Sequence, residues 1–219
     1  MFWKKVNRGL LLGAALLIFL IGYIVVQEVQ FDREKPVIED QCESYLTDLL
    51  DLQCNLQGEV GQVLPAATVA AQKDKMNRVL KAYWYGELPQ DEYSGYGVND
   101  VRLFYNKYLE QKVSILLSSA EVQLKGDRVS IKKDGPNRAT VKLSVDVKIR
   151  YAGKSGDFFY GYFMDYAADN EFDNGSQSNA QAEEPSYTDD TVFFNMVFEL
   201  YRVKGEWKIV SFTPGNYYW

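Results

Sequence analysis

The sequence predicts an α+β protein: an N-terminal transmembrane helix, followed by helices packed on a curved antiparallel sheet. Three observations predict this class. An uncharged apolar run fills residues 9–26, apolar residues recur at helical spacing between residues 37 and 110, and apolar and polar residues alternate in several later segments. A period of about 3.6 residues indicates amphipathic helices, and a period of two indicates strands with one buried face.

The apolar run from Gly9 to Val26 contains 18 residues. As a helix it would be about 27 Å long, close to the ~30 Å hydrocarbon core of a bilayer. Basic residues precede the run and acidic residues follow it: Lys4, Lys5 and Arg8 before, Glu28, Asp32 and Glu34 after. Cytoplasmic flanks of membrane spans are enriched in Lys and Arg. We therefore expect a cytoplasmic tail over residues 1–8, a span of the plasma membrane over 9–27, and an extracytoplasmic remainder.

A cleaved secretory signal is the alternative interpretation of this run. Signals have a shorter apolar region that ends in a small-x-small cleavage site. Val25, Val26, Gln27 and Glu28 follow each other at the end of the run, and no such site comes after them. The sequence therefore favours an uncleaved single-pass anchor.

The composition argues against several classes of function. A net charge of −6 makes nucleic acid a poor partner. The 219 residues include no His, which removes most zinc sites, catalytic triads and proton shuttles. The sequence also lacks a Gly-rich phosphate loop. We therefore expect no catalytic residues, no metal site and no cofactor.

Residues 28–64 predict a linker followed by an amphipathic helix. The linker is the charged stretch that ends at Pro36, and the helix runs from Val37 to Gln57. Its apolar residues are spaced 4, 3, 4, 3 and 4 apart: Ile38, Cys42, Tyr45, Leu49, Leu52 and Leu56. Such a seam fits a helix that covers its own domain, and it also fits a short parallel stalk in a homodimer.

The two cysteines bear on this choice. In one continuous helix, Cys42 and Cys54 would lie about 18 Å apart, whereas a disulfide needs Cα atoms within about 7 Å. Either the helix breaks between them, or they stay free, or they pair between chains. If residues 37–57 form a dimeric stalk, Cys42 lies on the seam and can form an inter-chain disulfide.

Residues 65–219 predict the extracytoplasmic α+β domain. One helix is expected from Ala66 to Tyr85, and another begins at Asn99. The segments 121–124 and 128–132 flank Lys125-Gly126-Asp127, which is typical of a hairpin. Further strands are expected over residues 141–151, 191–203 and 206–212, with turns at Gly135-Pro136-Asn137 and Lys204-Gly205.

The end of the chain carries a recognisable motif: Val197-Phe198-Glu199-Leu200, then Gly205-Glu206-Trp207-Lys208-Ile209, then Phe212. It resembles the closing strand pair of domains in the nuclear transport factor 2-like (cystatin-like) superfamily. The resemblance covers about residues 66–213 and implies a cone between helices and a curved sheet. It implies little about function, because that superfamily includes enzymes, ligand pockets and interaction modules. A single anchor before such a domain also resembles the bridging subunits of conjugative secretion machines in Gram-positive envelopes.

Residues 153–190 form an acidic, aromatic insert that is too long for an ordinary hairpin turn. Ten acidic residues and no Lys or Arg occur from 155 to 201. A solvated loop, a partner-docking loop with aromatic anchors, and a calcium site are the three interpretations. Asp169–Gly175 fails the EF-hand spacing, which argues against calcium. The candidate partner contacts are Phe158, Phe159, Tyr160, Tyr162, Phe163, Tyr166 and Phe172.

These features favour a membrane-anchored extracytoplasmic subunit that binds proteins of a cell-envelope complex, such as a secretion or conjugation apparatus. The alternative is an extracytoplasmic sensor or carrier with a small ligand in the cone, and an enzyme is the weakest hypothesis. A deep pocket with a buried carboxylate would favour the ligand or the enzyme. A cone filled by side chains such as Trp207 and Phe198 would favour the interaction subunit.

Overall fold

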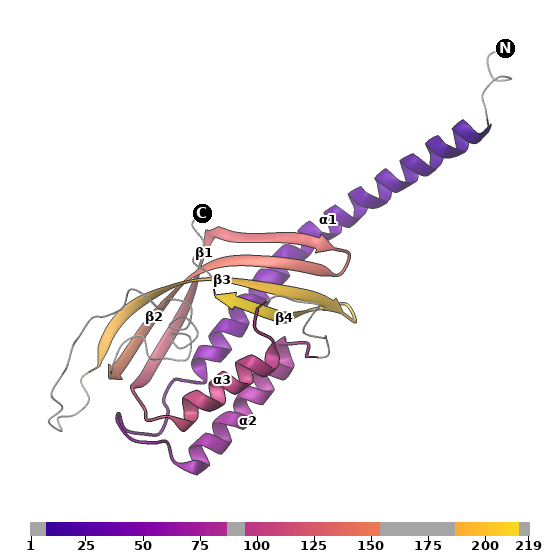
Figure 1. The fold of residues 1–219 in the computed structure, drawn as a ribbon. Helices are drawn as coiled ribbons and strands as arrows, with labels where there is room; N and C mark the ends of the chain where they lie inside the picture. Colours follow the sequence, from indigo (N-terminus) through magenta and orange to yellow (C-terminus); the bar gives the residue numbers. More distant parts are fainter. Residues whose placement is uncertain (1–7, 87–94, 154–186, 215–219) are drawn as a thin grey trace. The chain divides into compact units, whose positions relative to one another are not determined.

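The computed structural model describes residues 8–86, 95–153 and 187–214, and it has the predicted α+β composition (Figure 1). The chain comprises two compact units, residues 1–38 and residues 39–219. The elements are α1 (Arg8–Asp51), α2 (Ala66–Tyr83), α3 (Val98–Glu110), β1 (Ile115–Gly135), β2 (Arg138–Gly153), β3 (Thr188–Val203) and β4 (Glu206–Pro214).

The predicted linker before Pro36 is wrong, because α1 continues through it without a break. A proline inside a helix removes one backbone hydrogen bond. The charged residues around it nevertheless suit an exposed helix, as the Lys35–Asp32 pair at 2.8 Å and i,i+3 spacing shows. The helix ends at Asp51, six residues before the predicted end at Gln57. Charge along this stretch therefore marks a solvated helix face.

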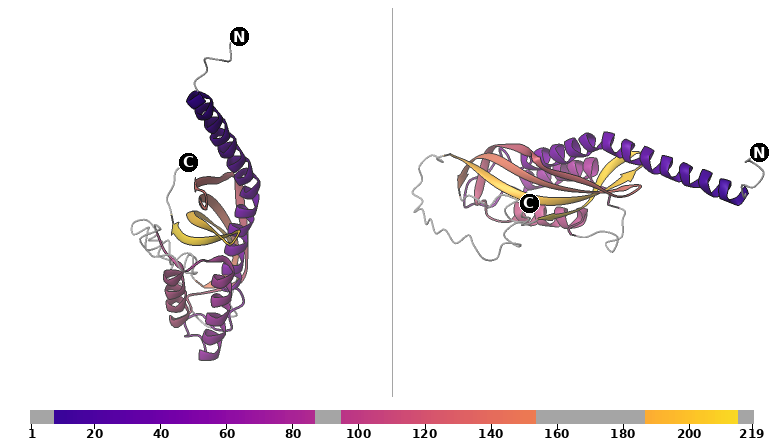
Figure 2. Two further views of the ribbon diagram at one scale, coloured as in Figure 1. Left: turned by 90° about the vertical axis from the view of Figure 1, so that its right-hand side faces the viewer. Right: turned by 90° about the horizontal axis from the view of Figure 1, so that it is seen from above.

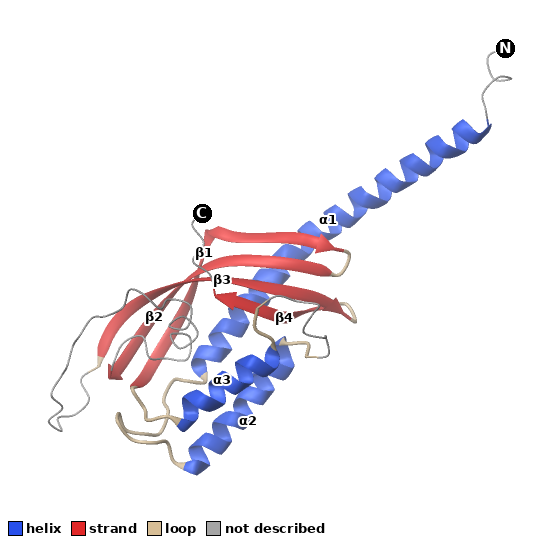
Figure 3. Ribbon diagram, in the orientation of Figure 1, coloured by secondary structure: helices blue, strands red, loops and turns tan. Residues whose placement is uncertain are grey.

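The four strands form one antiparallel sheet in the order β1-β2-β3-β4, so each strand pairs with the next along the chain (Figure 3). The alternation predicted for residues 141–151 is confirmed: Val141, Leu143 and Val145 are buried, whereas Lys142 and Lys148 are exposed. Both predicted turns connect neighbouring strands. The second is tight, with positive φ at Lys204 and Gly205 (52° and 90°).

The predicted hairpin at residues 125–127 is wrong. Leu124 pairs with Val145 and Val129 pairs with Leu143, so the four residues 125–128 lie opposite Ser144 alone. This is a wide irregularity within a single strand, of the kind called a β-bulge. The turn signal was misleading because both flanking segments pair with the long strand β2 and not with each other.

The helices of the second unit pack on one face of the sheet (Figure 2). Tyr45 of α1 is 2% exposed, and its ring centroid lies 5.7 Å from Tyr83, 5.8 Å from Trp84 and 5.9 Å from Phe198. The Gln41 side chain donates a hydrogen bond to the Trp207 carbonyl of β4. One aromatic cluster therefore connects α1, the end of α2 and the last two strands.

Helix α2 starts at Ala66 as predicted and ends at Tyr83. Helix α3 begins at Val98, one residue before the predicted start. Its first turn is capped because Asp100 accepts a hydrogen bond of 2.8 Å from the Gly97 backbone N–H. Ion pairing joins the two helices, since Lys73 lies 2.8 Å from Glu110.

Short segments cover the outer edge of β4. The Tyr85 N–H donates to the Ile209 carbonyl (2.8 Å), and Tyr96 exchanges two backbone hydrogen bonds with Phe212 (2.8 and 3.0 Å). Gly95 makes this approach feasible, because it has φ of 84° and an added Cβ would lie 2.5 Å from the Phe212 carbonyl oxygen. An open strand edge is a site for uncontrolled pairing, and here it is closed.

Gly153 provides a sharp test of the fold. Its φ is 109°, and an added Cβ would overlap the Ser114 carbonyl oxygen. We predict that Gly153→Ala lowers the free energy of unfolding by at least about 2 kcal/mol, since backbone strain alone costs about 1–3 kcal/mol. The measurement is the urea midpoint of the full chain in mild detergent, followed by tryptophan fluorescence.

Gly126→Ala is the matched control, because an added Cβ there meets nothing within 4 Å. We expect it to change the free energy of unfolding by no more than about 0.5 kcal/mol. Equal midpoints for the two variants would contradict the described connection between β2 and the start of β1.

Candidate membrane anchor and interaction surface

The first unit presents an apolar helical surface to its surroundings. Its most apolar window has a mean hydropathy of 2.7, and none of that window is buried. Side chains as large as Ile18 and Phe19 are 70% and 75% exposed. The buried core helix of a soluble domain would be covered, so this helix is a candidate membrane anchor.

The second unit has a closely packed interior. Phe198 is fully buried and Trp207 is 5% exposed. The Phe198 ring also contacts Phe212, with centroids 5.9 Å apart. These side chains occupy the space between the helices and the sheet, where a small ligand of the predicted cone would lie.

The hydroxyl of Tyr83, a partly buried polar group of this unit, has its hydrogen-bond partner within the fold. The Tyr83 hydroxyl donates a hydrogen bond of 2.7 Å to Asp48. Burial, and to a lesser extent the Asp48 carboxylate, raises the pKa of Tyr83 to about 12. Such a phenol is a poor general base at neutral pH. Among the described residues, no group of three or more His, Cys, Asp or Glu side chains is placed to hold a metal ion.

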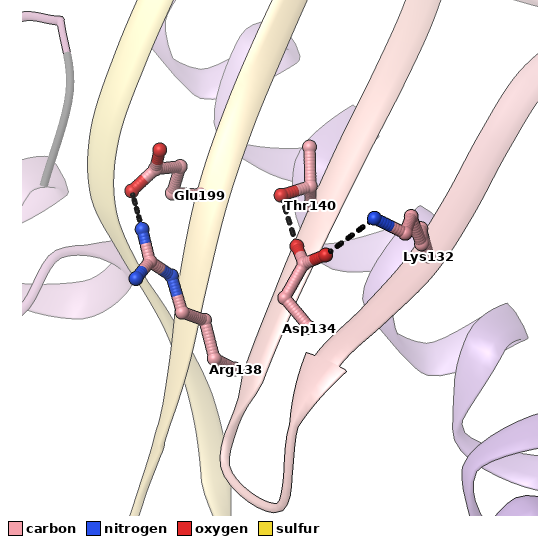
Figure 4. A network of polar contacts seen from close by, with 5 residues as sticks. All are labelled: Lys132, Asp134, Arg138, Thr140 and Glu199. Carbon is pink, nitrogen blue, oxygen red and sulfur yellow. Dashed lines mark hydrogen bonds and ion pairs between the residues drawn. The ribbon is translucent and has the colours of Figure 1, made fainter.

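A polar network lies at the end of the sheet formed by the β1–β2 turn (Figure 4). Asp134 accepts a hydrogen bond from Thr140 and pairs with Lys132 at 3.0 Å. Arg138 pairs with Glu199 of β3 at 2.8 Å. Together these contacts bind three strands at one end of the sheet.

The charges of the network shift two titrating groups. Burial opposes ionisation of Asp134, but hydrogen bonds from Thr140 and Lys132 and the charges of Lys132 and Arg138 lower the pKa of its carboxyl overall. Arg138 also lies 5.6 Å from the centre of the Tyr201 ring. Its pKa is raised despite partial burial, through the Glu199 carboxylate. The network therefore holds its charges firmly at neutral pH.

Seven aromatic residues predicted as partner contacts, from Phe158 to Phe172, lie outside the described residues. The structure does define where their segment is attached. Tyr151 of β2 pairs directly with Thr188 of β3, so the two attachment points lie side by side on neighbouring strands.

The predicted seam of α1 faces its own domain. Cys42 is fully buried, and Tyr45 and Leu49 are 2% and 1% exposed. This supports the interpretation of a helix that covers its own domain. The cysteines are free, and Cys54 lies beyond the end of α1. The inter-chain disulfide at Cys42 stays a prediction, and it requires the domain to open.

Sequence reasoning missed the network of Lys132, Asp134, Arg138, Thr140 and Glu199. Part of this network was visible in the sequence, because polar residues at every second position flank a predicted turn: Lys132, Asp134, Arg138 and Thr140. Glu199 is 59 residues beyond Thr140, and its place depends on the β2–β3 register, which pairs Thr140 with Glu199.

Comparisons with known proteins assign no family. No family model matches the chain, and no curated protein matches it. Solved structures that match include a crystal structure of the intermembrane space region of the chloroplast protein ARC6. The match has a TM-score of 0.33 and 12% sequence identity, and it covers 79% of this chain and 92% of that chain.

The burial of the two thiols predicts their reactivity. Cys42 is fully buried, whereas Cys54 is half-buried, and burial raises the pKa of the Cys54 thiol to about 11. Because the thiolate is the reactive form, both should react slowly with maleimide in the native protein, and Cys54 should react first. Mass spectrometry of the labelled full chain over time measures the two rates.

Unfolding in urea is the control, since it should bring both thiols to one rate. Fast labelling of native Cys42, or a dimer band on a non-reducing gel that disappears with Cys42→Ser, would show that this part of α1 opens.

Asp134 should contribute to stability in a pH-dependent way. Its folded pKa is lowered from the ordinary value of 3.8. Its contribution is therefore present above that value and is lost as the pH falls through the folded pKa. Solvent screening limits it to about 0.2–1 kcal/mol. Asp134→Asn should be less stable than the wild type at pH 7 and equally stable near pH 2, as measured by urea midpoints.

The exposed Asp74 of α2 offers the control Asp74→Asn, which should change the midpoint little at pH 7. A deficit of Asp134→Asn that persists undiminished at low pH would contradict an electrostatic role.

Proposed function

We propose that this chain is a single-pass membrane protein whose domain binds other proteins on the extracytoplasmic side. The observation that carries the proposal is the exposed apolar helix joined to a domain with a filled interior. The helix suits a bilayer. Among the described residues, buried side chains such as Phe198 and Trp207 occupy the interior of the domain, so we expect its surface to serve recognition.

The orientation follows from charge. Lys4, Lys5 and Arg8 precede the apolar run, and acidic residues dominate the helix after it. Basic flanks stay in the cytoplasm. Residues after the span would then be extracytoplasmic, and the partners would be proteins of a cell envelope, such as a secretion or conjugation apparatus.

We also propose that the domain belongs to the nuclear transport factor 2-like class. The motif over residues 197–212 supports this assignment. Phe198 pairs with Phe212 and Leu200 pairs with Ile209 in the β3–β4 hairpin, and all four are buried. The class allows pocket proteins and enzymes as well. The buried Phe198 and Trp207 favour the interaction subunit over a small-ligand carrier.

In-cell cross-linking tests the proposal. The tagged full-length protein is cross-linked, purified from membranes, and its partners are identified by mass spectrometry. A matched variant lacks residues 154–186, with Gly153 joined to Tyr187 through Asn-Gly. Because Tyr151 pairs with Thr188, this short loop can connect the two strands without moving them.

We expect the wild type to capture a reproducible set of envelope proteins, and the shortened variant to lose part or all of that set while keeping its urea midpoint. Recovery of the protein alone from both samples would contradict the interaction function. Loss of folding in the variant would show that the segment contributes to the core.

A further inference from the structure

The two edges of the sheet differ in how far other segments of the chain cover them. The edge of β4 is covered by Tyr85 and Tyr96 through backbone hydrogen bonds. On the β1 side, Asn55 donates to the Leu117 carbonyl at 2.7 Å, and Cys54 has a hydrogen bond with the backbone of Ala120. From Glu121 to Lys132, no strand or bridge among the described residues pairs with the outer edge of β1, which lies along the border of the sheet (Figure 1).

The distal part of β1 is a well-formed strand. Residues 129–133 pair with β2 in unbroken register, from Val129 opposite Leu143 to Lys133 opposite Ala139. Val129 and Ile131 therefore lie on the buried face of the sheet, yet they are only half-buried because β1 is the last strand. An added strand would complete their burial.

The side chains of this segment carry positive charge. Arg128, Lys132 and Lys133 lie within six residues and outnumber the two flanking acids, Asp127 and Asp134. Asp134 already pairs with Lys132 and accepts a hydrogen bond from Thr140. A second copy of β1 in antiparallel alignment centred on Ser130 would keep both buried faces on the same side and place Arg128 opposite Lys132. Like charges directly opposite each other destabilise strand pairing, so this edge disfavours its own copy.

We infer that the edge of β1 over residues 128–133 accepts an extended acidic segment of a partner protein as a fifth strand. Backbone hydrogen bonds would supply affinity, as in other cases of strand addition. Apolar side chains of the partner would cover Val129 and Ile131, and alternating acidic side chains would face Arg128 and Lys132. The inference rests on the proposed interaction function and specifies the partner.

The test uses the full chain in lipid nanodiscs and a hexapeptide of alternating glutamate and valine. At about 1 mM peptide, amide hydrogen exchange over residues 128–135 should slow roughly twofold or more, which a Kd near 1 mM gives. Two peptides serve as controls: the same peptide with alternate amides N-methylated, which cannot pair, and a lysine–valine peptide, whose charge is wrong.

Two double variants are compared. Arg128→Gln/Lys132→Gln removes charge from the edge strand β1, and the control Lys148→Gln/Arg150→Gln removes charge from exposed positions on β2. The first should weaken peptide binding about threefold to tenfold through loss of two opposite-charge pairs. The second should leave binding unchanged.

Four results would overturn the inference. The first is no slowing of amide exchange with the acidic peptide, and the second is equal binding of the N-methylated peptide. The third is equal binding of the acidic peptide by the two variants. The fourth is concentration-dependent protection of residues 118–135 without peptide, which would make a second copy of the chain the occupant. If cross-linking captures envelope proteins while the peptide fails, the edge inference falls and the interaction function stands. If neither captures anything, both fall.

Discussion

The contact of Tyr45 with Tyr83, Trp84 and Phe198 is the interaction on which the second unit depends. Its three ring partners belong to the end of α2, the segment after it and strand β3, at centroid distances of 5.7 to 5.9 Å. Trp84 continues into Tyr85, which bonds to β4. Truncating a buried aromatic side chain costs about 3–5 kcal/mol. Tyr45 therefore positions both the helical layer and the cover of one sheet edge.

That arrangement also decides what the domain offers to other molecules. Buried aromatic rings, Phe198 and Trp207 among them, lie between the helices and the sheet, and the proposed function places recognition on the surface. On that surface the fold closes the β4 edge and holds the end of the sheet together through the Arg138–Glu199 pair at 2.8 Å. The β1 edge, with its basic side chains, is then the feature most suited to a partner strand.

Local pattern predicted the elements but not their long-range pairing. The apolar run, α2 and the alternating strand β2 were predictable, because each has a strong period in its own sequence. The misread hairpin at residues 125–127 and the linker before Pro36 had real local signals, Gly in one case and charge with proline in the other. Tertiary pairing with β2 overrode the first, and the helical residues flanking Pro36 outweighed the second.

Dependence on long-range pairing also explains which parts of the candidate site were predictable from the sequence. The candidate anchor was predictable because eighteen consecutive uncharged residues need no partner to be informative. The network of Asp134, Arg138 and Glu199 was not visible, since it depends on the register between β2 and β3. The burial of Cys42 was undecided because a helical seam has the same spacing whether it faces its own sheet or another helix.

In the proposed topology, residues 9–26 span a membrane and the domain lies outside the cytoplasm. Labelling of intact cells with a membrane-impermeant maleimide tests it most directly, with Lys148→Cys, an exposed position on β2, compared against the wild type. With the domain outside the cytoplasm, Lys148→Cys should be labelled rapidly in intact cells and the wild type only slightly. Labelling of Lys148→Cys only after the cells are permeabilised would contradict the orientation.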